Sequence, residues 1–255
     1  MIARGTEHPN GVRVNVRASR GGSGRLTHVD GDTPRVPKST CLRCGRLLAM
    51  TLVLASRSPR RREILGWLGV EFETVDPAVE ELTAGLDPEG LVLENARLKS
   101  LAGLEQVGER SDAIILGVDT DVFVDGEMLG QPADFDQARD HLKRLSGRSH
   151  DVLSGVCLLG PRAQGIPGAP VRERAGVARS AVTVRDLDET TLSTYLASEE
   201  WRGRAGGYAI QGLGSILIDR VEGDFSNVVG LPVRLLLELD PALSAGLRGN
   251  PKAQK

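Results

Sequence analysis

The chain has 255 residues, of which 40% are hydrophobic and 26% are charged. These proportions are ordinary for a globular protein, and they exclude a mostly disordered chain, a collagen and a long coiled coil. The sequence contains no apolar run long enough to cross a membrane as a helix. The net charge of −2 combines a basic segment, residues 1–49 with a net +6, and an acidic segment, residues 50–255 with a net −8.

Residues 1–49 have a composition that is unfavourable for folding. They lack Phe, Trp and Tyr and are rich in Gly, Arg, Ser, Thr and Pro. Such a segment buries too little apolar surface to offset its conformational entropy. We therefore expect a disordered extension, or an over-extended reading of a gene that starts at Met50. The excess of Arg leaves a transit peptide as an alternative, although no amphipathic helix is visible.

The three cysteines give little support for a metal site or a disulfide. Cys41 and Cys44 have the spacing of half a zinc site, but a structural zinc ion needs four ligands. Cys157 stands alone, and His8 and His28 are poorly spaced to complete the set. Zinc is the less favoured interpretation. The low cysteine content fits a reducing compartment.

Regular periodicity begins at residue 51, where short apolar runs alternate with helical patterns. Ser58 followed by Pro59 is a typical helix start, with the serine as the cap, and Asp87 followed by Pro88 starts another helix. The pair Asp125-Gly126 indicates a tight turn. In chain order we expect a strand over 51–55, a helix over 59–68, a strand over 70–75, a helix over 88–107, a strand over 113–118 and a hairpin over 121–130.

The remaining residues continue the alternation, with Asp134 and Asp188 as helix caps. In chain order we expect a helix from 134 to 145, a strand over 150–159, a surface loop over 160–170, a strand over 177–185, a helix over 188–198, a strand over 216–221 and a last helix that includes 234–239. Interleaved strands and helices with one tight hairpin predict an α/β fold with a mixed sheet. We assign residues 50–242 to one domain and residues 243–255 to a polar tail.

The first candidate site follows the first strand, in the run from Ser56 to Arg61 (SRSPRR). Ser56 and Ser58 supply hydroxyl groups, and Arg60 and Arg61 supply guanidinium groups at a helix N-terminus. Free backbone N–H groups at such a terminus favour an anion, and arginine binds phosphate oxygens in a bidentate manner. The alternative is an ordinary capped helix with solvated arginines.

The second candidate site is the run Gly117-Val118-Asp119-Thr120-Asp121, which we place at the end of the central strand. Ligands of α/β sheets gather at the carboxyl ends of strands. A carboxylate there binds a divalent metal or takes a proton from water. Asp121 shares a face with Asp119 if the strand continues. The alternative is a pair of acids that face solvent.

The third candidate site is the glycine-rich run 205–214, which contains Gln211. Glycine lets the backbone approach a ligand, and a glutamine amide both donates and accepts, as reading a nucleobase edge requires. The alternative is a mobile surface loop. Glu80, Glu81 and Lys99 are surface charges when taken singly. Together with the other two sites they describe a nucleotide-hydrolysing pocket that has no P-loop, because the GxxxxGK[ST] pattern is missing.

Four motifs in this order resemble those of the Maf family, over Met50 to about Asp240. They are the runs 54–61 (LASRSPRR), 117–120 (GVDT), 208–212 (YAIQG) and 226–232 (SNVVGLP). The resemblance implies a two-lobed α/β fold, in which helices flank an elongated mixed β-sheet and the nucleotide lies in a central cleft. It also implies a cytoplasmic nucleoside triphosphate pyrophosphatase, a hydrolase that releases a nucleoside monophosphate and pyrophosphate.

The resemblance assigns roles to individual residues. Asp119 corresponds to the proton acceptor that activates water, and Arg60, Thr120 and Gln211 correspond to positions linked to substrate choice. We expect Ser56, Ser58, Arg61 and Lys99 to bind substrate phosphates, and Glu81 and Asp119 to hold a divalent cation, Mg²⁺ or Mn²⁺. Gln211 favours dTTP, UTP and modified pyrimidine nucleotides. One departure is Gln131, which stands where the family has a lysine.

Two other functions stay open at this point. One is a pyrophosphatase for modified purine nucleotides such as ITP. The other is a non-enzymatic regulator of cell division, because the family has been associated with septum formation. The acidic character of residues 50–255 argues against nucleic-acid binding. We expect a nucleoside triphosphate as the partner and no membrane contact, and we leave a homodimer open.

Overall fold

The computed structural model describes residues 50–110, 112–161 and 170–247. The predictions for residues 1–49, which include the zinc alternative at Cys41 and Cys44, lie outside the described residues, as does most of the predicted loop 160–170. The boundary predicted at Met50 is not tested by these residues and stays a prediction.

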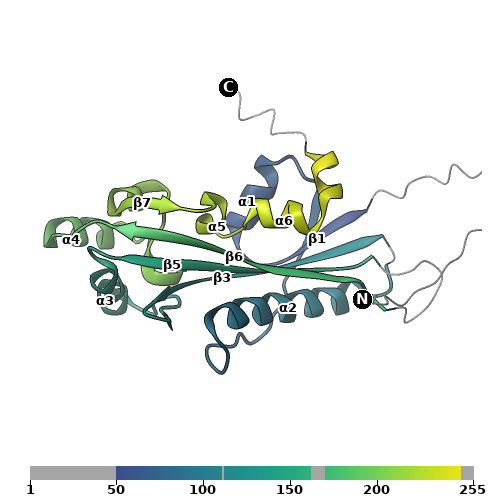
Figure 1. Cartoon of the computed structure of the whole chain (residues 1–255), viewed down its shortest axis with the longest axis horizontal. Coiled ribbons are helices and arrows are strands. Elements are labelled where there is room, and N and C mark those ends of the chain that lie inside the picture. The colour runs from purple at the N-terminus through teal and green to yellow at the C-terminus, as the bar shows by residue number, and fades with distance from the viewer. Residues whose placement is uncertain (1–49, 111, 162–169, 248–255) are drawn as a thin grey trace, which may run out of the picture. The chain divides into compact units, whose positions relative to one another are not determined.

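A seven-stranded mixed sheet forms the centre of the described chain, in the order β2-β1-β3-β5-β6-β7 with β4 paired to β3 (Figure 1). The strands are β1 Thr51–Ala55, β2 Phe72–Val75, β3 Ala113–Val124, β4 Glu127–Met128, β5 Ser149–Leu159, β6 Glu173–Val184 and β7 Ile218–Glu222. β1 pairs in parallel with β2 and β3, whereas every other pair is antiparallel. The predicted α/β class with a mixed sheet is therefore confirmed.

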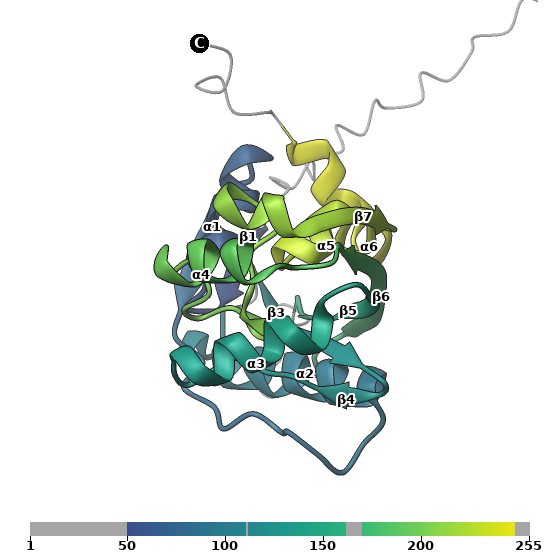
Figure 2. The same cartoon turned by 90° about the vertical axis from the view of Figure 1, so that its left-hand side faces the viewer.

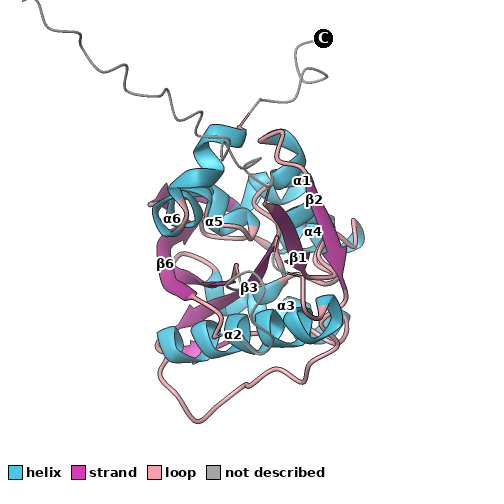
Figure 3. Ribbon diagram, turned by 90° about the vertical axis from the view of Figure 1, so that its right-hand side faces the viewer, coloured by secondary structure: helices cyan, strands magenta, loops and turns pink. Residues whose placement is uncertain are grey.

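Helices flank this sheet. They are α1 Pro59–Trp67, α2 Pro88–Val107, α3 Phe135–Leu145, α4 Glu189–Ala197, α5 Phe225–Val229 and α6 Val233–Leu239. Figure 1 shows α2 below the sheet and α1, α5 and α6 above it, and Figure 3 shows the same separation from one end. Figure 2, which looks from the opposite end, brings α3 and α4 to the front. None of the helices in the described ranges is long and apolar enough to cross a membrane.

The helix starts follow the predicted caps with one exception. The carboxylates of Asp87, Asp134 and Asp188 each accept a hydrogen bond from a backbone N–H of the following first turn. Ser58 precedes α1 as predicted, but its hydroxyl makes no capping bond within the described residues. The backbone N–H of Ser58 donates instead to Ser56 Oγ at 3.2 Å. The first turn of α1 is thus left without a side-chain cap.

Several predicted strand limits were wrong, and strand pairing explains the differences. β3 joins the predicted strand 113–118 to the first half of the predicted hairpin 121–130 without a break, because β5 pairs with it along Ile115–Phe123. The hairpin itself is confirmed, since β4 pairs antiparallel with β3 across Asp125-Gly126. β6 begins at Glu173 rather than at residue 177, because β5 pairs with it from Leu159 onward. The predicted strand 216–221 is observed as β7, which begins at Ile218 after a 3₁₀ turn over Gly212–Leu217. Helix α5 was not predicted.

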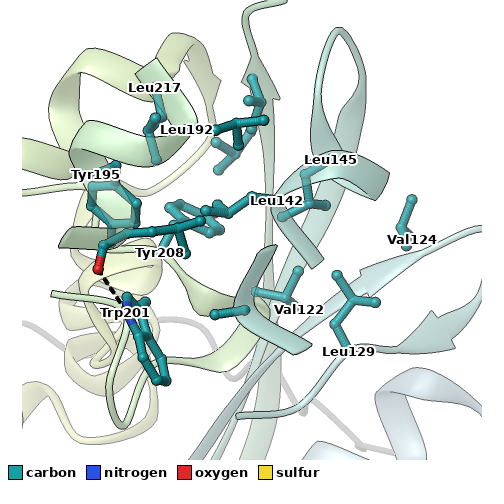
Figure 4. Close-up of a cluster of buried hydrophobic side chains, with 14 of the residues drawn as sticks. Val122, Val124, Leu129, Leu142, Leu145, Leu192, Tyr195, Trp201, Tyr208 and Leu217 are labelled. Carbon is teal, nitrogen blue, oxygen red and sulfur yellow. Dashed lines mark hydrogen bonds between the residues drawn. The ribbon is translucent and has the colours of Figure 1, made fainter. Parts of the chain in front are cut away.

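Two hydrophobic clusters lie on one face of β3, and a polar position separates them. Ile114, Leu116 and Val118 belong to a cluster with α1 and α6. Val122 and Val124 belong to a second cluster with α3 and α4, which Figure 4 shows around Tyr195, Trp201 and Tyr208.

Thr120 lies between these two clusters and pairs in register with the fully buried Ser154 of β5. Their hydroxyl oxygens are 2.8 Å apart. Because alternate residues of a strand share a face, this hydroxyl pair interrupts an otherwise continuous apolar surface. Two cores on one sheet, divided at Thr120, are consistent with the expected two lobes.

The C-terminal part of the described chain ends in a 3₁₀ turn over Pro241–Gly246. Leu243 packs against the cluster that contains α1 and α6. The predicted polar tail 243–255 thus begins inside this turn, and residues 248–255 lie outside the described residues.

Candidate active site

A cleft of about 600 Å³ opens at the edge of β3 where β1 ends. β1 pairs with β3 only as far as Ala55 opposite Gly117, and β4 pairs again from Phe123. Between these points the edge of β3 has no partner strand among the described residues, and the start of α1 lies beside it. Every residue predicted for the site lines this cleft: Ser56, Ser58, Arg60, Arg61, Glu81, Lys99, Asp119, Thr120 and Gln211.

The position of Asp119 differs from the prediction in one respect. We expected Asp119 at the carboxyl end of its strand, but it lies in the middle of the 12-residue β3. The strand that ends here is the parallel neighbour β1. The cleft therefore still lies beyond the carboxyl end of a parallel strand, as the general rule for α/β sheets requires. Asp121 shares a face with Asp119, as predicted.

Lys99 lies between two carboxylates at the floor of the cleft. Its Nζ atom is 2.6 Å from Asp119 Oδ1 and 2.7 Å from Glu81 Oε1. The Asp119 side chain is 4% exposed and that of Lys99 is 9% exposed, whereas that of Glu81 is 46% exposed. A buried ion pair needs good geometry to offset the desolvation of its two charges. Removing one partner strongly destabilises the fold, because the other charge stays buried and uncompensated. Glu81 is the carboxylate of this group that reaches solvent.

The close packing of α2 on the sheet makes this contact possible. A Cβ atom at Gly117 would lie 2.2 Å from the Ala96 carbonyl oxygen, and one at Gly155 would lie 2.1 Å from the Val92 carbonyl oxygen. Side chains at these two positions would push the helix away from β3 and β5. The glycines thus bring Lys99 within hydrogen-bond distance of Asp119.

Asn95 lies one helical turn before Lys99 and connects the same elements. Its Nδ2 donates to Asp119 Oδ2 at 3.1 Å and to the Leu82 carbonyl at 3.0 Å, while its Oδ1 accepts from the Leu82 N–H at 2.7 Å. Asn95 is 1% exposed. It therefore fixes both the orientation of Asp119 and the position of the segment that carries Glu81. Sequence reasoning missed Asn95, although its spacing from Lys99 was a usable signal.

Arg61 is buried at the end of the first turn of α1 and makes three hydrogen bonds. Its Nη1 donates to Ser56 Oγ at 3.1 Å, its Nη2 to Thr120 Oγ1 at 3.3 Å and its Nε to the Gly230 carbonyl at 2.9 Å. Burial lowers the pKa of Arg61, while the negative charges of Asp119, Glu81 and Asp121 oppose that shift. The guanidinium is therefore fixed in orientation and faces the acidic side of the cleft.

The last sequence motif, 226–232, contributes through its backbone. Gly230 follows the last residue of helix α5, and its carbonyl oxygen accepts from Arg61 and from the Thr120 hydroxyl. Ser226 holds the segment by donating to Asp224 Oδ1 and accepting from the Val233 N–H. This motif positions Arg61 and Thr120, which lie more than 100 residues away in the sequence.

The glycine-rich run forms two 3₁₀ turns, Ala205–Gly207 and Gly212–Leu217, with Gln211 immediately before the second. Residues 206–209 are buried, so the alternative of a mobile surface loop is wrong for them. Glu200 orients the second turn, because its carboxylate accepts from the Leu213 and Gly214 N–H groups at 3.0 and 3.1 Å. Glu200 was not predicted, since its partners are 13 and 14 residues away.

Three further residues named in the sequence analysis differ in whether they line the cleft. Gln131 and Asp121 line the cleft, whereas Glu80 is exposed and lies outside its lining. Burial and the charge of Asp119 raise the pKa of Asp121 to about 7. Three carboxylates therefore share the cleft, and Lys99 pairs with two of them.

The carboxylates of this cleft form a partial set of ligands for a divalent cation. No group of three His, Cys, Asp or Glu residues within the described ranges is placed to hold a metal ion by itself. Mg²⁺ commonly takes only one or two protein carboxylates and completes its shell with water and phosphate oxygens. Glu81, with its accessible carboxylate, and Asp119 supply such a partial set.

Comparison with known proteins agrees with this geometry. The model of the family described as Maf-like protein matches residues 51–240. A dTTP/UTP pyrophosphatase of Deinococcus radiodurans is 42% identical over 191 residues, which cover 75% of this chain and 92% of the relative. A dTTP/UTP pyrophosphatase of Pyrococcus abyssi is 37% identical over 201 residues, covering 79% and 99%. One of Caldanaerobacter subterraneus is 38% identical over 190 residues, covering 74% and 87%.

The matched region contains every element of the cleft, from β1 through α6, and all nine predicted site residues. Residues 1–49 lie outside the matched range. The chain belongs to the Maf-like protein family.

Proposed function

We propose that this chain hydrolyses dTTP, UTP and related modified pyrimidine nucleotides to the nucleoside monophosphate and pyrophosphate. The observation that carries the proposal is the buried Asp119–Lys99–Glu81 group at the floor of a cleft whose wall holds Arg61 and the start of α1. The names of the relatives support the same activity and the same nucleotides.

The phosphates bind at the start of α1. The first turn of this helix has no side-chain cap among the described residues, so its N–H groups are available to phosphate oxygens. Ser56, Ser58 and Arg60 lie around the same point, and Arg61 is held rigidly behind them. Groups fixed in this way stabilise developing negative charge without a reorganisation cost.

Asp119 is the general base in this proposal. A water molecule attacks the α phosphorus, its proton passes to the Asp119 carboxylate, and the bond from the α phosphorus to the bridging oxygen breaks to release pyrophosphate. Asn95 and Lys99 keep the carboxylate in place, since each bonds one of its oxygens. Lys99 and Arg61 also offset the charge on the phosphate oxygens.

A divalent cation, Mg²⁺ or Mn²⁺, completes the proposed site. Glu81 and Asp119 hold it, together with oxygen atoms of the substrate. When bound, such an ion polarises the phosphoryl group and neutralises charge on the phosphates. The protein's own contribution is the fixed pair of carboxylates on either side of Lys99.

The residues that select the nucleobase of the substrate are Gln211, Arg60 and Thr120. Gln211 lies half-buried in the cleft wall, immediately before the second 3₁₀ turn. Its amide both donates and accepts, which suits the edge of a pyrimidine. The Thr120 hydroxyl is engaged by Arg61, Ser154 and the Gly230 carbonyl, so Thr120 acts by positioning Arg61.

The location and assembly are further proposals. We propose the cytoplasm, because the sequence has few cysteines and the described one, Cys157, is a buried thiol whose pKa burial raises to about 11. A homodimer stays a prediction, which the molar mass in solution will test.

The test is the turnover of Asp119→Asn compared with that of the unchanged chain. Asparagine keeps the size of the side chain but removes the base, and loss of a general base costs about 100- to 10,000-fold in rate. Pyrophosphate release is measured with dTTP, UTP, CTP, GTP and ITP, and thermal unfolding checks that the variant is folded. Unchanged turnover in a folded Asp119→Asn variant would show that the base lies elsewhere. Fastest turnover of ITP would refute the pyrimidine assignment in favour of the purine alternative.

A further inference from the structure

Arg204 is a basic residue of the cleft that has no role in the proposed mechanism. It precedes the 3₁₀ turn Ala205–Gly207, and its side chain is half-buried in the wall of the cleft. Its Nε donates to the Glu200 carbonyl at 3.3 Å. Within the described residues Arg204 forms no ion pair, and its Nη groups make no hydrogen bond. Burial lowers the pKa of Arg204, and no acidic side chain opposes that shift.

Two other basic side chains of the cleft have acidic partners, whereas Arg60 and Arg61 form no ion pair among the described residues. Lys99 lies between Glu81 and Asp119, and Arg57 lies 3.6 Å from Asp76. Desolvating a guanidinium group that has no counter-charge is unfavourable, so such a group is normally paired. Arg204 therefore differs from Lys99 and Arg57, because it lines the cleft half-buried and without an acidic partner among the described residues.

The surroundings of Arg204 also favour an anion. The Gly206 N–H donates to the Gly130 carbonyl at 2.7 Å, which joins this turn to the residue before the uncharged Gln131. The Arg60 Nη2 donates to the Gly203 carbonyl at 3.4 Å, so a second guanidinium reaches the residue before Arg204. Two arginines, one in α1 and one just before the 3₁₀ turn, thus lie at the same part of the wall.

We propose that Arg204 is a phosphate-binding residue, which donates through its Nη groups to oxygens of the triphosphate chain and of the pyrophosphate product. This inference rests on the proposed function for the identity of the substrate. The Glu200 carbonyl holds the Nε end of the guanidinium, so its planar fork is oriented before the phosphate arrives. A fork of two parallel donors matches a phosphate group.

The experiment measures binding of inorganic pyrophosphate by calorimetry, because this probe has no base and needs no turnover. The test variant is Arg204→Gln, which removes the charge but keeps a donor within reach of the Glu200 carbonyl. We expect the dissociation constant of pyrophosphate to rise about 10- to 100-fold, the equivalent of one charge-assisted hydrogen bond. Arg204→Lys, which restores the charge, is expected to recover most of the affinity.

The matched control is Arg202→Gln. Arg202 lies two residues away, pairs with Glu199 at 2.9 Å and stacks over Trp201, and it does not line the cleft. Its substitution removes the same charge and is expected to leave pyrophosphate binding unchanged. Equal affinities in Arg204→Gln and the unchanged chain would overturn the proposal, as would equal losses in the two glutamine variants. Thermal unfolding confirms that each variant is folded.

Kinetics separates this inference from the proposed function. If Arg204→Gln also raises the KM for dTTP while kcat changes less, Arg204 acts in substrate binding as proposed. If the unchanged chain binds pyrophosphate through Arg204 but hydrolyses no nucleotide, the proposed function fails and the phosphate site stands. If the chain hydrolyses dTTP and Arg204→Gln alters neither KM nor pyrophosphate affinity, the inference fails and the function stands.

Discussion

Substitution of Gly117 by alanine tests whether the packing of α2 creates the active site. The added Cβ would lie 2.2 Å from the Ala96 carbonyl oxygen and 2.3 Å from Ser100 Oγ. The Ala96 contact is with helix backbone, so the helix as a whole has to move by about 1 Å to reach a normal contact distance. That movement separates Lys99 Nζ from Asp119 Oδ1, which are now 2.6 Å apart.

The expected consequences follow from these distances. Overpacking of a close-packed core costs roughly 1–3 kcal/mol of folding free energy, and we expect the upper end because backbone atoms are involved. A misplacement of about 1 Å at a catalytic group costs roughly 100-fold in rate. The assays are urea unfolding monitored by circular dichroism, and pyrophosphate release from dTTP under kcat/KM conditions.

Gly66 supplies the matched control. It lies near the end of α1, and no atom other than its own helix backbone lies within 4 Å of the position of an added Cβ. Gly66→Ala is therefore expected to stabilise the protein by roughly 0.5–1 kcal/mol, because alanine loses less conformational entropy in a helix. Activity is expected to stay the same. A Gly117→Ala variant that keeps both its stability and its kcat/KM would refute the packing argument.

Two more predictions concern the glycine-rich run and its support. Burial lowers the pKa of His150, which bonds to the Tyr208 hydroxyl, to about 4. In the unfolded chain the His150 imidazole takes up a proton near pH 6.5, whereas in the folded chain it does so only near pH 4. Protonation of His150 therefore lowers the free energy of unfolding by about 3 kcal/mol as the pH falls from 6.5 to 4. Urea unfolding of His150→Gln should show a smaller fall over that range, and an equal fall would contradict the assignment. Glu200→Ala, which leaves the N–H groups of Leu213 and Gly214 without their acceptor, is expected to raise the KM for dTTP about 10-fold and to reduce the preference for dTTP over CTP. Glu200→Gln should recover part of this preference, whereas a lower melting temperature with an unaltered preference would indicate a purely structural role.

The sequence by itself determined the features that depend on neighbouring residues. Alternation and helical spacing predicted the mixed α/β sheet, and the caps Asp87, Asp134 and Asp188 predicted three helix starts. The common face of Asp119 and Asp121 followed from the two-residue period of a strand. The motifs and the family resemblance also identified nine of the residues that line the cleft. The structural predictions succeeded because each rests on contacts within one element or on residues close together in the chain.

Tertiary structure alone decided how these residues work together. Arg61 meets the Gly230 carbonyl across 169 residues, and Lys99 meets Asp119 across 20, only because the sheet order and the glycine-bounded packing of α2 place them so. The length of β3 was set by its pairing with β5, which no pattern within β3 indicates. The unpaired charge of Arg204 is likewise invisible in the sequence, because it depends on which acidic side chains the fold keeps away from it. Local periodicity records the preferences of single elements, whereas distances and desolvation arise only when distant elements pack.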